Sequence, residues 1–165
     1  MNIDFSIFPN GPIRSDVEIA VGNSIEANDI RIFFAGKKID EITIDLLNSA
    51  YSHDPAACLA FMSPIAFAFF LPLWMKISLN DFDKADAIPE TVIGYFLALA
   101  EGKYPDKLSA IMAMYSSAQL GVVALFLREM SSQYFCNYPV DRAQMALLLY
   151  WQKYDANNSK GSGSP

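Results

Sequence analysis

The sequence predicts a mainly α-helical protein, folded as a single-domain irregular helical bundle over residues 1–155 with a kinked central helix. Three observations predict this class. Of the 165 residues, 53% are hydrophobic and 13% aromatic, which is enough apolar surface for one packed core. Apolar residues recur at intervals of three and four along most of the chain. Capping residues or prolines precede most of these segments, as they do at helix starts.

The first 40 residues carry the weakest signals. Apolar and polar residues alternate over residues 2–8, which favours a short strand, and residues 30–34 are its candidate partner in one short β pairing. Ser15 followed by Glu18 is typical of a capping box and predicts a helix start. The inner face of that helix would consist of Val17, Val21 and Ile25. Asp40 predicts the start of the next helix, with apolar spacing up to Ala50.

The middle of the chain contains an uncharged run of 21 residues, Pro55 to Met75. A bilayer-spanning helix needs about 20 predominantly apolar residues, so a membrane segment is the alternative interpretation of this run. Two start signals, Asp54-Pro55 and Ser63-Pro64, divide it. We therefore expect a short helix over 55–62 and a longer buried helix from Pro64 towards Leu79, in a protein that does not insert into membranes.

A proline lies inside the longer of these two helices. Pro72 has no N–H group and crowds the carbonyl of Ala68, at a cost of about 3 kcal/mol. We expect a kink there, and we expect the neighbouring large apolar side chains to offset the cost by packing in the core. These side chains are Phe67, Phe69, Phe70, Leu71 and Trp74.

The rest of the chain predicts four more helices. An acidic loop over residues 80–87 comes first; a helix then begins at Pro89 and ends at Gly102, and the next begins at Pro105. Ser116 or Ser117 caps the following helix, which contains Gly121 and so predicts a close helix crossing. Pro139 and Asp141 predict the start of the last helix. Residues 156–165 lose the periodicity, and we expect them to form a disordered, linker-like tail.

Composition excludes several kinds of site. One histidine, His53, is too few for a multi-histidine zinc site, and Cys58 and Cys136 are too far apart for a Cys-x-x-Cys pair, so we expect reduced buried thiols. The acidic loop lacks the glycine and glutamate of an EF-hand, and no glycine-rich phosphate loop occurs. We expect no catalytic residues, no cofactor and no metal, and we favour a non-enzymatic role.

The net charge of −6 argues against a nucleic-acid partner, because phosphate contacts need a basic face. The charge is unevenly distributed, with −7 over residues 1–90 and +1 over residues 91–165. An acidic surface of this kind attracts a cationic protein. The candidate partner-binding residues are Asp16, Glu18, Glu26, Asp29, Asp40, Glu41 and Asp45. Polar residues interrupt any apolar run near Met1, so we predict no signal peptide and a cytoplasmic location.

The segment over residues 61–72, Phe-Met-Ser-Pro-Ile-Ala-Phe-Ala-Phe-Phe-Leu-Pro, resembles the signature of a family of small uncharacterised bacterial proteins. Ser117-Ala118-Gln119 with the helix after it, and Tyr150-Trp151, are also similar to that family, so the resemblance covers residues 58–151. The family often has arginine where this chain has Ala68. The resemblance implies one domain and a bacterial source, and it brings no established activity.

Two functional hypotheses follow. The first is a non-catalytic protein-binding domain, most concretely a bacterial immunity-type inhibitor whose acidic surface occludes a cationic toxin. The second is a small-ligand-binding protein or an enzyme that uses a pocket lined by the aromatic side chains from Phe67 to Trp74. A buried carboxylate beside a cleft would favour the second hypothesis, and solid packing around these aromatics would argue against it.

Overall fold

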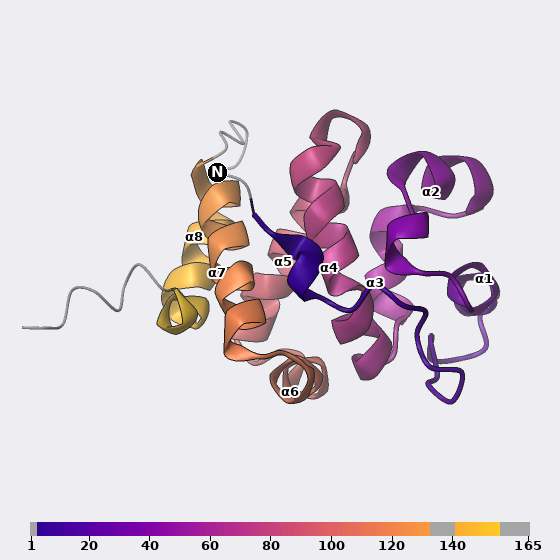
Figure 1. Cartoon of the computed structure of the whole chain (residues 1–165), viewed down its shortest axis with the longest axis horizontal. Coiled ribbons are helices and arrows are strands. Elements are labelled where there is room, and N and C mark those ends of the chain that lie inside the picture. The colour runs from indigo at the N-terminus through magenta and orange to yellow at the C-terminus, as the bar shows by residue number, and fades with distance from the viewer. Residues whose placement is uncertain (1–2, 133–140, 156–165) are drawn as a thin grey trace, which may run out of the picture.

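The computed structural model describes residues 3–132 and 141–155, which fold into helices joined by short loops (Figure 1). The described residues form no β-sheet, so the prediction of a mainly α-helical fold is confirmed. The α-helices are α1 (Ile25–Phe34), α2 (Ile44–Ala50), α3 (Cys58–Phe61), α4 (Pro64–Asn80), α5 (Ile88–Ala100), α6 (Pro105–Met114), α7 (Ser117–Ser132) and α8 (Arg142–Leu149). The 3-10 helices are η1 (Phe5–Ile7), η2 (Ile39–Glu41), η3 (Pro55–Ala57), η4 (Phe82–Lys84) and η5 (Trp151–Tyr154).

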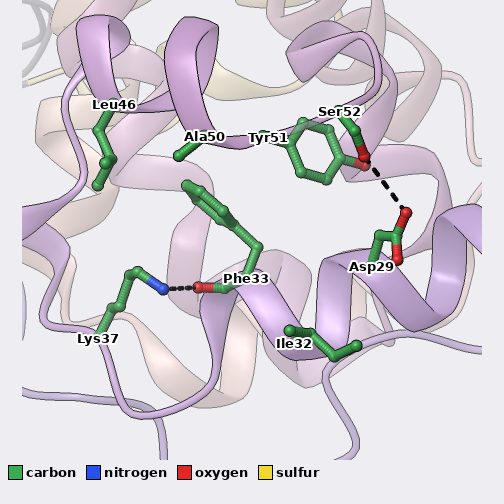
Figure 2. A pocket seen from close by; sticks show the side chains of 8 residues that line it. All are labelled: Asp29, Ile32, Phe33, Lys37, Leu46, Ala50, Tyr51 and Ser52. Atoms are coloured by element: carbon green, nitrogen blue, oxygen red, sulfur yellow. Dashed lines mark hydrogen bonds between the residues drawn. The ribbon is translucent and has the colours of Figure 1, made fainter.

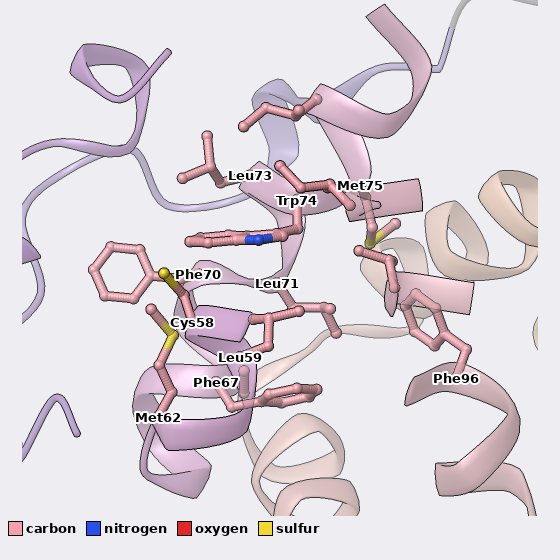
Figure 3. Close-up of a cluster of buried hydrophobic side chains, with 14 of the residues drawn as sticks. Cys58, Leu59, Met62, Phe67, Phe70, Leu71, Leu73, Trp74, Met75 and Phe96 are labelled. Carbon is pink, nitrogen blue, oxygen red and sulfur yellow. The ribbon is translucent and has the colours of Figure 1, made fainter. Parts of the chain in front are cut away.

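Helix α4 lies at the centre of the molecule. It packs against α5 and α6, while α8 packs against α5 and α7. Helices α1 and α2 lie at one end of the molecule and α7 and α8 at the other, while α3 lies between α1 and α4 (Figure 1). Phe67, Phe70 and Trp74 of α4 are fully buried, together with residues of α3 and with Phe96 of α5 (Figure 3). Most of the uncharged run is therefore core, as predicted, although Ile65 is 49% exposed.

The two predicted start signals of the central run both form. The Asp54 carboxylate accepts a hydrogen bond from the Ala56 N–H at 2.8 Å, and η3 and α3 follow it. The Ser63 hydroxyl oxygen accepts one from the Ala66 N–H at 3.2 Å at the start of α4. Each cap satisfies an N–H that would otherwise have no partner at the helix terminus. Local sequence therefore determines where these helices begin.

Helix α4 continues through Pro72, which leaves one backbone carbonyl of the helix without its usual donor. A residue at the end of α6 supplies the donor instead. Pro72 has no N–H to donate to the carbonyl of Ala68, four residues earlier. The hydroxyl of Tyr115, the residue that ends α6, donates to that carbonyl at 2.6 Å. Both groups are buried, and burial raises the pKa of Tyr115. A side chain 47 residues away in sequence thus replaces the missing helical hydrogen bond.

The predicted N-terminal β pairing is wrong. Residues 5–7 form η1, in which the Asp4 carboxylate accepts a hydrogen bond from the Ser6 N–H, and residues 30–34 belong to α1. Phe8, which follows η1, is buried and packs edge-on against Tyr115, with ring centres 5.2 Å apart. Single bridges join Pro12 to Lys38 and Ala20 to Met62. They hold this extended segment against the helices without forming a sheet.

The predicted helix starting at Ser15 is also wrong, and the one predicted from Asp40 begins later. Residues 15–24 form turns and extended backbone, and Gly22, with φ of +84°, interrupts them. Ser24 caps α1 instead, because its hydroxyl accepts a hydrogen bond from the Ala27 N–H at 3.1 Å. Residues 39–41 form η2, and the Thr43 hydroxyl caps α2 at Leu46 N–H.

The predicted helices of the second half form close to their expected starts. Gly102, with φ of +76°, ends the helix that begins at Ile88. Ser116 and Gln119 form a reciprocal capping box at the start of α7, and Asp141 caps α8. Pro139, the other predicted start residue, lies outside the described residues, as do Cys136 and the tail over 156–165.

Within the described ranges, no helix combines the length and the apolar character needed to cross a membrane.

Candidate functional site

A pocket opens between α1 and α2, with a volume of about 310 Å³ (Figure 2). We call it the α1–α2 pocket. Helix α1 and the loop after it contribute one wall, and α2 and the residues after it contribute the other. The lining residues are Asp29, Ile32, Phe33, Lys37, Leu46, Ala50, Tyr51 and Ser52.

Two aromatic rings form the buried part of the pocket. Phe33 of α1 and Tyr51, which ends α2, pack edge-on with ring centres 5.5 Å apart, and each is only 7% exposed. Phe33 also contacts Phe34, whose ring reaches Trp74 of the central helix. The rigid core therefore holds this part of the pocket in place.

One end of the pocket is acidic. The Oδ2 atom of Asp29 accepts hydrogen bonds from His53 Nε2 at 2.7 Å and from the Ser52 hydroxyl at 3.3 Å. Its Oδ1 atom receives no hydrogen bond from any residue in the described ranges, and the side chain is 35% exposed. Burial raises the pKa of Tyr51, and the Cys58 thiol and the negative charges of Asp29 and Glu26 raise it further. The Asp29 carboxylate is therefore close enough to Tyr51 to affect its pKa.

The other end is basic, and Figure 2 shows Lys37 across the pocket from Asp29. The Lys37 ammonium donates a hydrogen bond to the carbonyl of Phe33 and lies 4.6 Å from the centre of the Phe33 ring. A lysine at a helix C-terminus stabilises the carbonyls there and the negative end of the helix dipole. Lys37 therefore has a structural partner, and its charge makes the pocket electrically asymmetric.

The seven acidic residues singled out from the sequence differ in their surroundings. Three have cationic partners: Asp16 pairs with Arg14, Glu18 with Arg31 at 3.9 Å, and Asp45 with Lys84 at 3.0 Å. Asp29 accepts a hydrogen bond from His53 at 2.7 Å. A fifth, Glu41, accepts a hydrogen bond from the Lys38 N–H at 2.9 Å.

Glu26 and Asp40 are exposed, and their carboxylates have no ion-pair or hydrogen-bond partner in the part of the chain that the structure describes. Glu26 and Asp29 both lie on α1 beside the pocket, whereas Asp16 and Glu18 lie in the extended segment before α1. The structure therefore brings together only part of the predicted acidic surface, and three of its carboxylates have a cation beside them.

The sequence prediction missed two exposed isoleucines on α1. Ile25 is 74% exposed and Ile32, which lines the pocket, is 76% exposed. They are seven residues, or two helical turns, apart and so lie on the same outward side of α1. The sequence does indicate this outward position, because Ala27, Ile30 and Phe34 form the inner face of a helix capped by Ser24, and Ile25 and Ile32 lie off that face. The prediction that Ile25 lies on the inner face of a helix starting at Ser15 is therefore wrong.

The aromatics from Phe67 to Trp74 do not line this pocket. Phe67, Phe70 and Trp74 have no exposed surface, and only Phe69 of this group is half-buried. The described residues contain no cluster of three or more potential metal ligands.

A second unusual polar group lies on α6. The Lys107 ammonium donates a hydrogen bond to the carbonyl of Leu59 at 2.6 Å. The centres of three aromatic rings lie close to it, at 4.4 Å for Phe67, 5.1 Å for Tyr95 and 5.8 Å for Tyr104. Burial lowers the pKa of Lys107 to about 8. This side chain ties α6 to α3, and its contacts account for its position.

A family model describes residues 25–155 of the chain, a range that begins at the first residue of α1 and ends just after η5. The chain belongs to this family, which is described as a family of unknown function (DUF6714). The prediction of membership in an uncharacterised family is thereby confirmed. Neither the curated proteins nor the solved structures compared with the chain contain a match.

Proposed function

We propose that this DUF6714 member is a non-catalytic binding protein that docks a basic protein on the outer side of α1 and the α1–α2 pocket. More specifically, we propose a bacterial, cytoplasmic immunity-type inhibitor that occludes a cationic toxin. The observation that carries the proposal is the pair of exposed isoleucines, Ile25 and Ile32, beside a pocket and next to acidic side chains.

The apolar part of this surface supplies the affinity. Complete burial of a side chain such as isoleucine contributes about 1.5–3 kcal/mol. Protein interfaces typically place apolar residues at the centre and polar residues at the rim. Ile25 and Ile32 would form the centre, with Glu26 and Asp29 at the rim. A partner that covers the two isoleucines would therefore gain several kcal/mol.

The charge supplies the choice of partner. Residues 1–90 carry a net charge of −7, and the intramolecular ion pairs leave that net charge unchanged. A negative field of this kind increases the association rate of a positively charged protein and disfavours acidic ones. Because salt screens this field over about 8 Å at physiological ionic strength, association with the partner should slow as salt rises.

A small-ligand-binding protein or enzyme is the second candidate, now with the α1–α2 pocket as its site. The hydrogen bond between Asp29 and His53 favours it, since a histidine held by a carboxylate can move protons. Turnover or tight binding of a metabolite that leaves α1's exposed isoleucines uncovered would support this candidate over the first.

Capture from the source cell at physiological salt, followed by binding measurements with the purified captured protein, tests the first proposal. We expect a basic partner. Ile32→Glu should weaken its binding at least 30-fold, since 30-fold corresponds to about 2 kcal/mol. Ile65→Glu is the matched control, because Ile65 is a 49% exposed isoleucine on α4. Equal effects of the two variants, or no partner in repeated captures, would contradict the proposal.

A further inference from the structure

The α1–α2 pocket has features that select the chemistry of the side chain it receives. Asp29 lies at one end and Lys37 at the other (Figure 2), so a charged occupant can fit in only one direction. A cation is attracted to the Asp29 end and repelled from the Lys37 end. An anion would be drawn toward Lys37, but that ammonium is already bound to the Phe33 carbonyl and lies over its ring.

The Asp29 carboxylate has unused hydrogen-bonding capacity. Oδ2 accepts from His53 and Ser52, whereas Oδ1 accepts from no residue in the described ranges. At 35% exposure the carboxylate is already partly withdrawn from water, and covering it would remove the remaining solvent. A buried acceptor left without a donor costs about 1–3 kcal/mol or more. A partner that covers this pocket must therefore supply a donor to Oδ1.

The walls fit a long side chain with a planar cationic end. Ile32, Phe33 and Leu46 offer apolar surface along which methylene groups can lie. The Tyr51 ring closes the acidic end; it is only 7% exposed and packs against Phe33 and His53. A volume of about 310 Å³ is at the small end of ligand pockets and suits one side chain.

We propose that the α1–α2 pocket receives an arginine side chain of the basic partner, whose guanidinium donates to Oδ1 of Asp29. Its methylene groups lie along Ile32 and Phe33. Arginine is favoured over lysine because its guanidinium is more weakly hydrated than an ammonium and offers several N–H donors in a planar arrangement that matches a carboxylate. This inference rests on the proposed function and names the residue type that the pocket recognises.

The test uses small blocked probes and the wild-type chain. N-acetyl-arginine methylamide is titrated against the ¹⁵N-labelled protein and compared with its citrulline counterpart, which is nearly the same shape but uncharged. We expect the arginine probe to shift the amide signals of residues 29–37 and 46–53 and to bind at least fivefold more tightly than the citrulline probe. Equal affinity, or shifts confined to other regions, would overturn the inference. The comparison needs no variant, so it does not depend on a mutant that folds.

Two variants then locate the interaction. Asp29→Asn should abolish the preference for arginine, whereas Asp45→Asn should retain it, because Asp45 lies outside the pocket and pairs with Lys84. A preference that survives Asp29→Asn would overturn the inference.

The captured partner separates this inference from the proposed function. If Ile32→Glu weakens partner binding and Asp29→Asn does not, the proposed function stands and the arginine assignment fails. If neither variant weakens it, both fail. If the free arginine probe binds as expected but Ile32→Glu leaves the partner bound, the pocket chemistry stands and the proposed function fails.

Discussion

The hydrogen bond between Tyr115 and the carbonyl of Ala68 should stabilise the fold because helix α4 contains Pro72. Proline removes the N–H that would normally donate to Ala68 O, and the Tyr115 hydroxyl takes its place at 2.6 Å. Tyr115→Phe keeps the ring and removes only the hydroxyl. The buried carbonyl then has no donor, which costs about 1–3 kcal/mol in the free energy of unfolding.

A double-mutant cycle connects this cost to the proline. In a Pro72→Ala background the restored N–H can donate to Ala68 O, so the Tyr115 hydroxyl is no longer needed. We expect Tyr115→Phe to cost about 1 kcal/mol less there than in the chain with Pro72, and this difference is the interaction energy between the two positions. The difference is large enough to measure.

Urea unfolding followed by far-UV circular dichroism measures the four proteins of the cycle, with a check that the m-value is unchanged. Tyr95→Phe is the control, because the Tyr95 ring is packed but its hydroxyl makes no hydrogen bond within the described part of the chain. If Tyr115→Phe had the same cost in both backgrounds, the hydroxyl would not be compensating for Pro72, and the reasoning would be refuted.

Two further predictions concern Lys107 and two glycines. Burial lowers the pKa of Lys107 from 10.5 to about 8, so the unfolded chain binds more protons between these pH values, and stability should rise with pH there relative to Lys107→Met. Screening of a side chain that is not fully buried limits the rise to about 1–2 kcal/mol in urea unfolding at pH 7.5 and 10, and a parallel pH dependence of both proteins would contradict it. Gly121→Ala should stabilise α7 by up to about 1 kcal/mol, because alanine favours the helix and the new Cβ would lie at 3.4 Å from the Tyr154 carbonyl oxygen, an ordinary contact. Gly102→Ala should instead destabilise the fold by about 1 kcal/mol, because the φ of Gly102 is +76°. Thermal melts that shift in the same direction for both glycine variants would contradict this pair.

The sequence predicts the central region well because its signals are local. Asp54 and Ser63 each cap a helix within three residues of themselves, and a proline follows each one. An N-cap hydrogen bond needs no distant partner, so the pattern alone locates it. The partner that repairs the backbone at Pro72 lies 47 residues from Ala68, and no local pattern indicates it.

The N-terminal errors have the same physical origin. Ser15 with Glu18 matches the capping-box pattern better than Ser24 with Ala27 does, but Gly22 and the contacts made by Arg31 favour the start at Ser24. The Arg31 guanidinium donates to the Ala20 carbonyl at 2.7 and 3.1 Å, and so holds residues before α1 in an extended conformation. This tertiary contact outweighs a helix propensity of a few tenths of a kcal/mol per residue.

The candidate site was only partly predictable. A count of charges found the acidic half of the chain, but it could not show that Asp45 pairs with Lys84, 39 residues later, or that Asp29 pairs with His53. The α1–α2 pocket depends on how two helices meet, and that arrangement is set by Phe33 and Tyr51 rather than by a motif. The outward position of Ile25 follows from the helical spacing of Ala27, Ile30 and Phe34 once the helix start is placed at Ser24.

The residues that stabilise the fold differ from those that are exposed for binding, so loss of binding can be measured separately from loss of stability. Substitutions at Phe70 or Trp74, which are fully buried, would lower stability by several kcal/mol and say nothing about a partner. Ile32 is 76% exposed, so Ile32→Glu should change the unfolding free energy by no more than about 0.5 kcal/mol. A loss of binding in that variant can therefore be assigned to the surface itself. Conversely, a large loss of stability in Ile32→Glu would mean that Ile32 contributes to folding, and the argument for a docking surface on α1 would lose its main support.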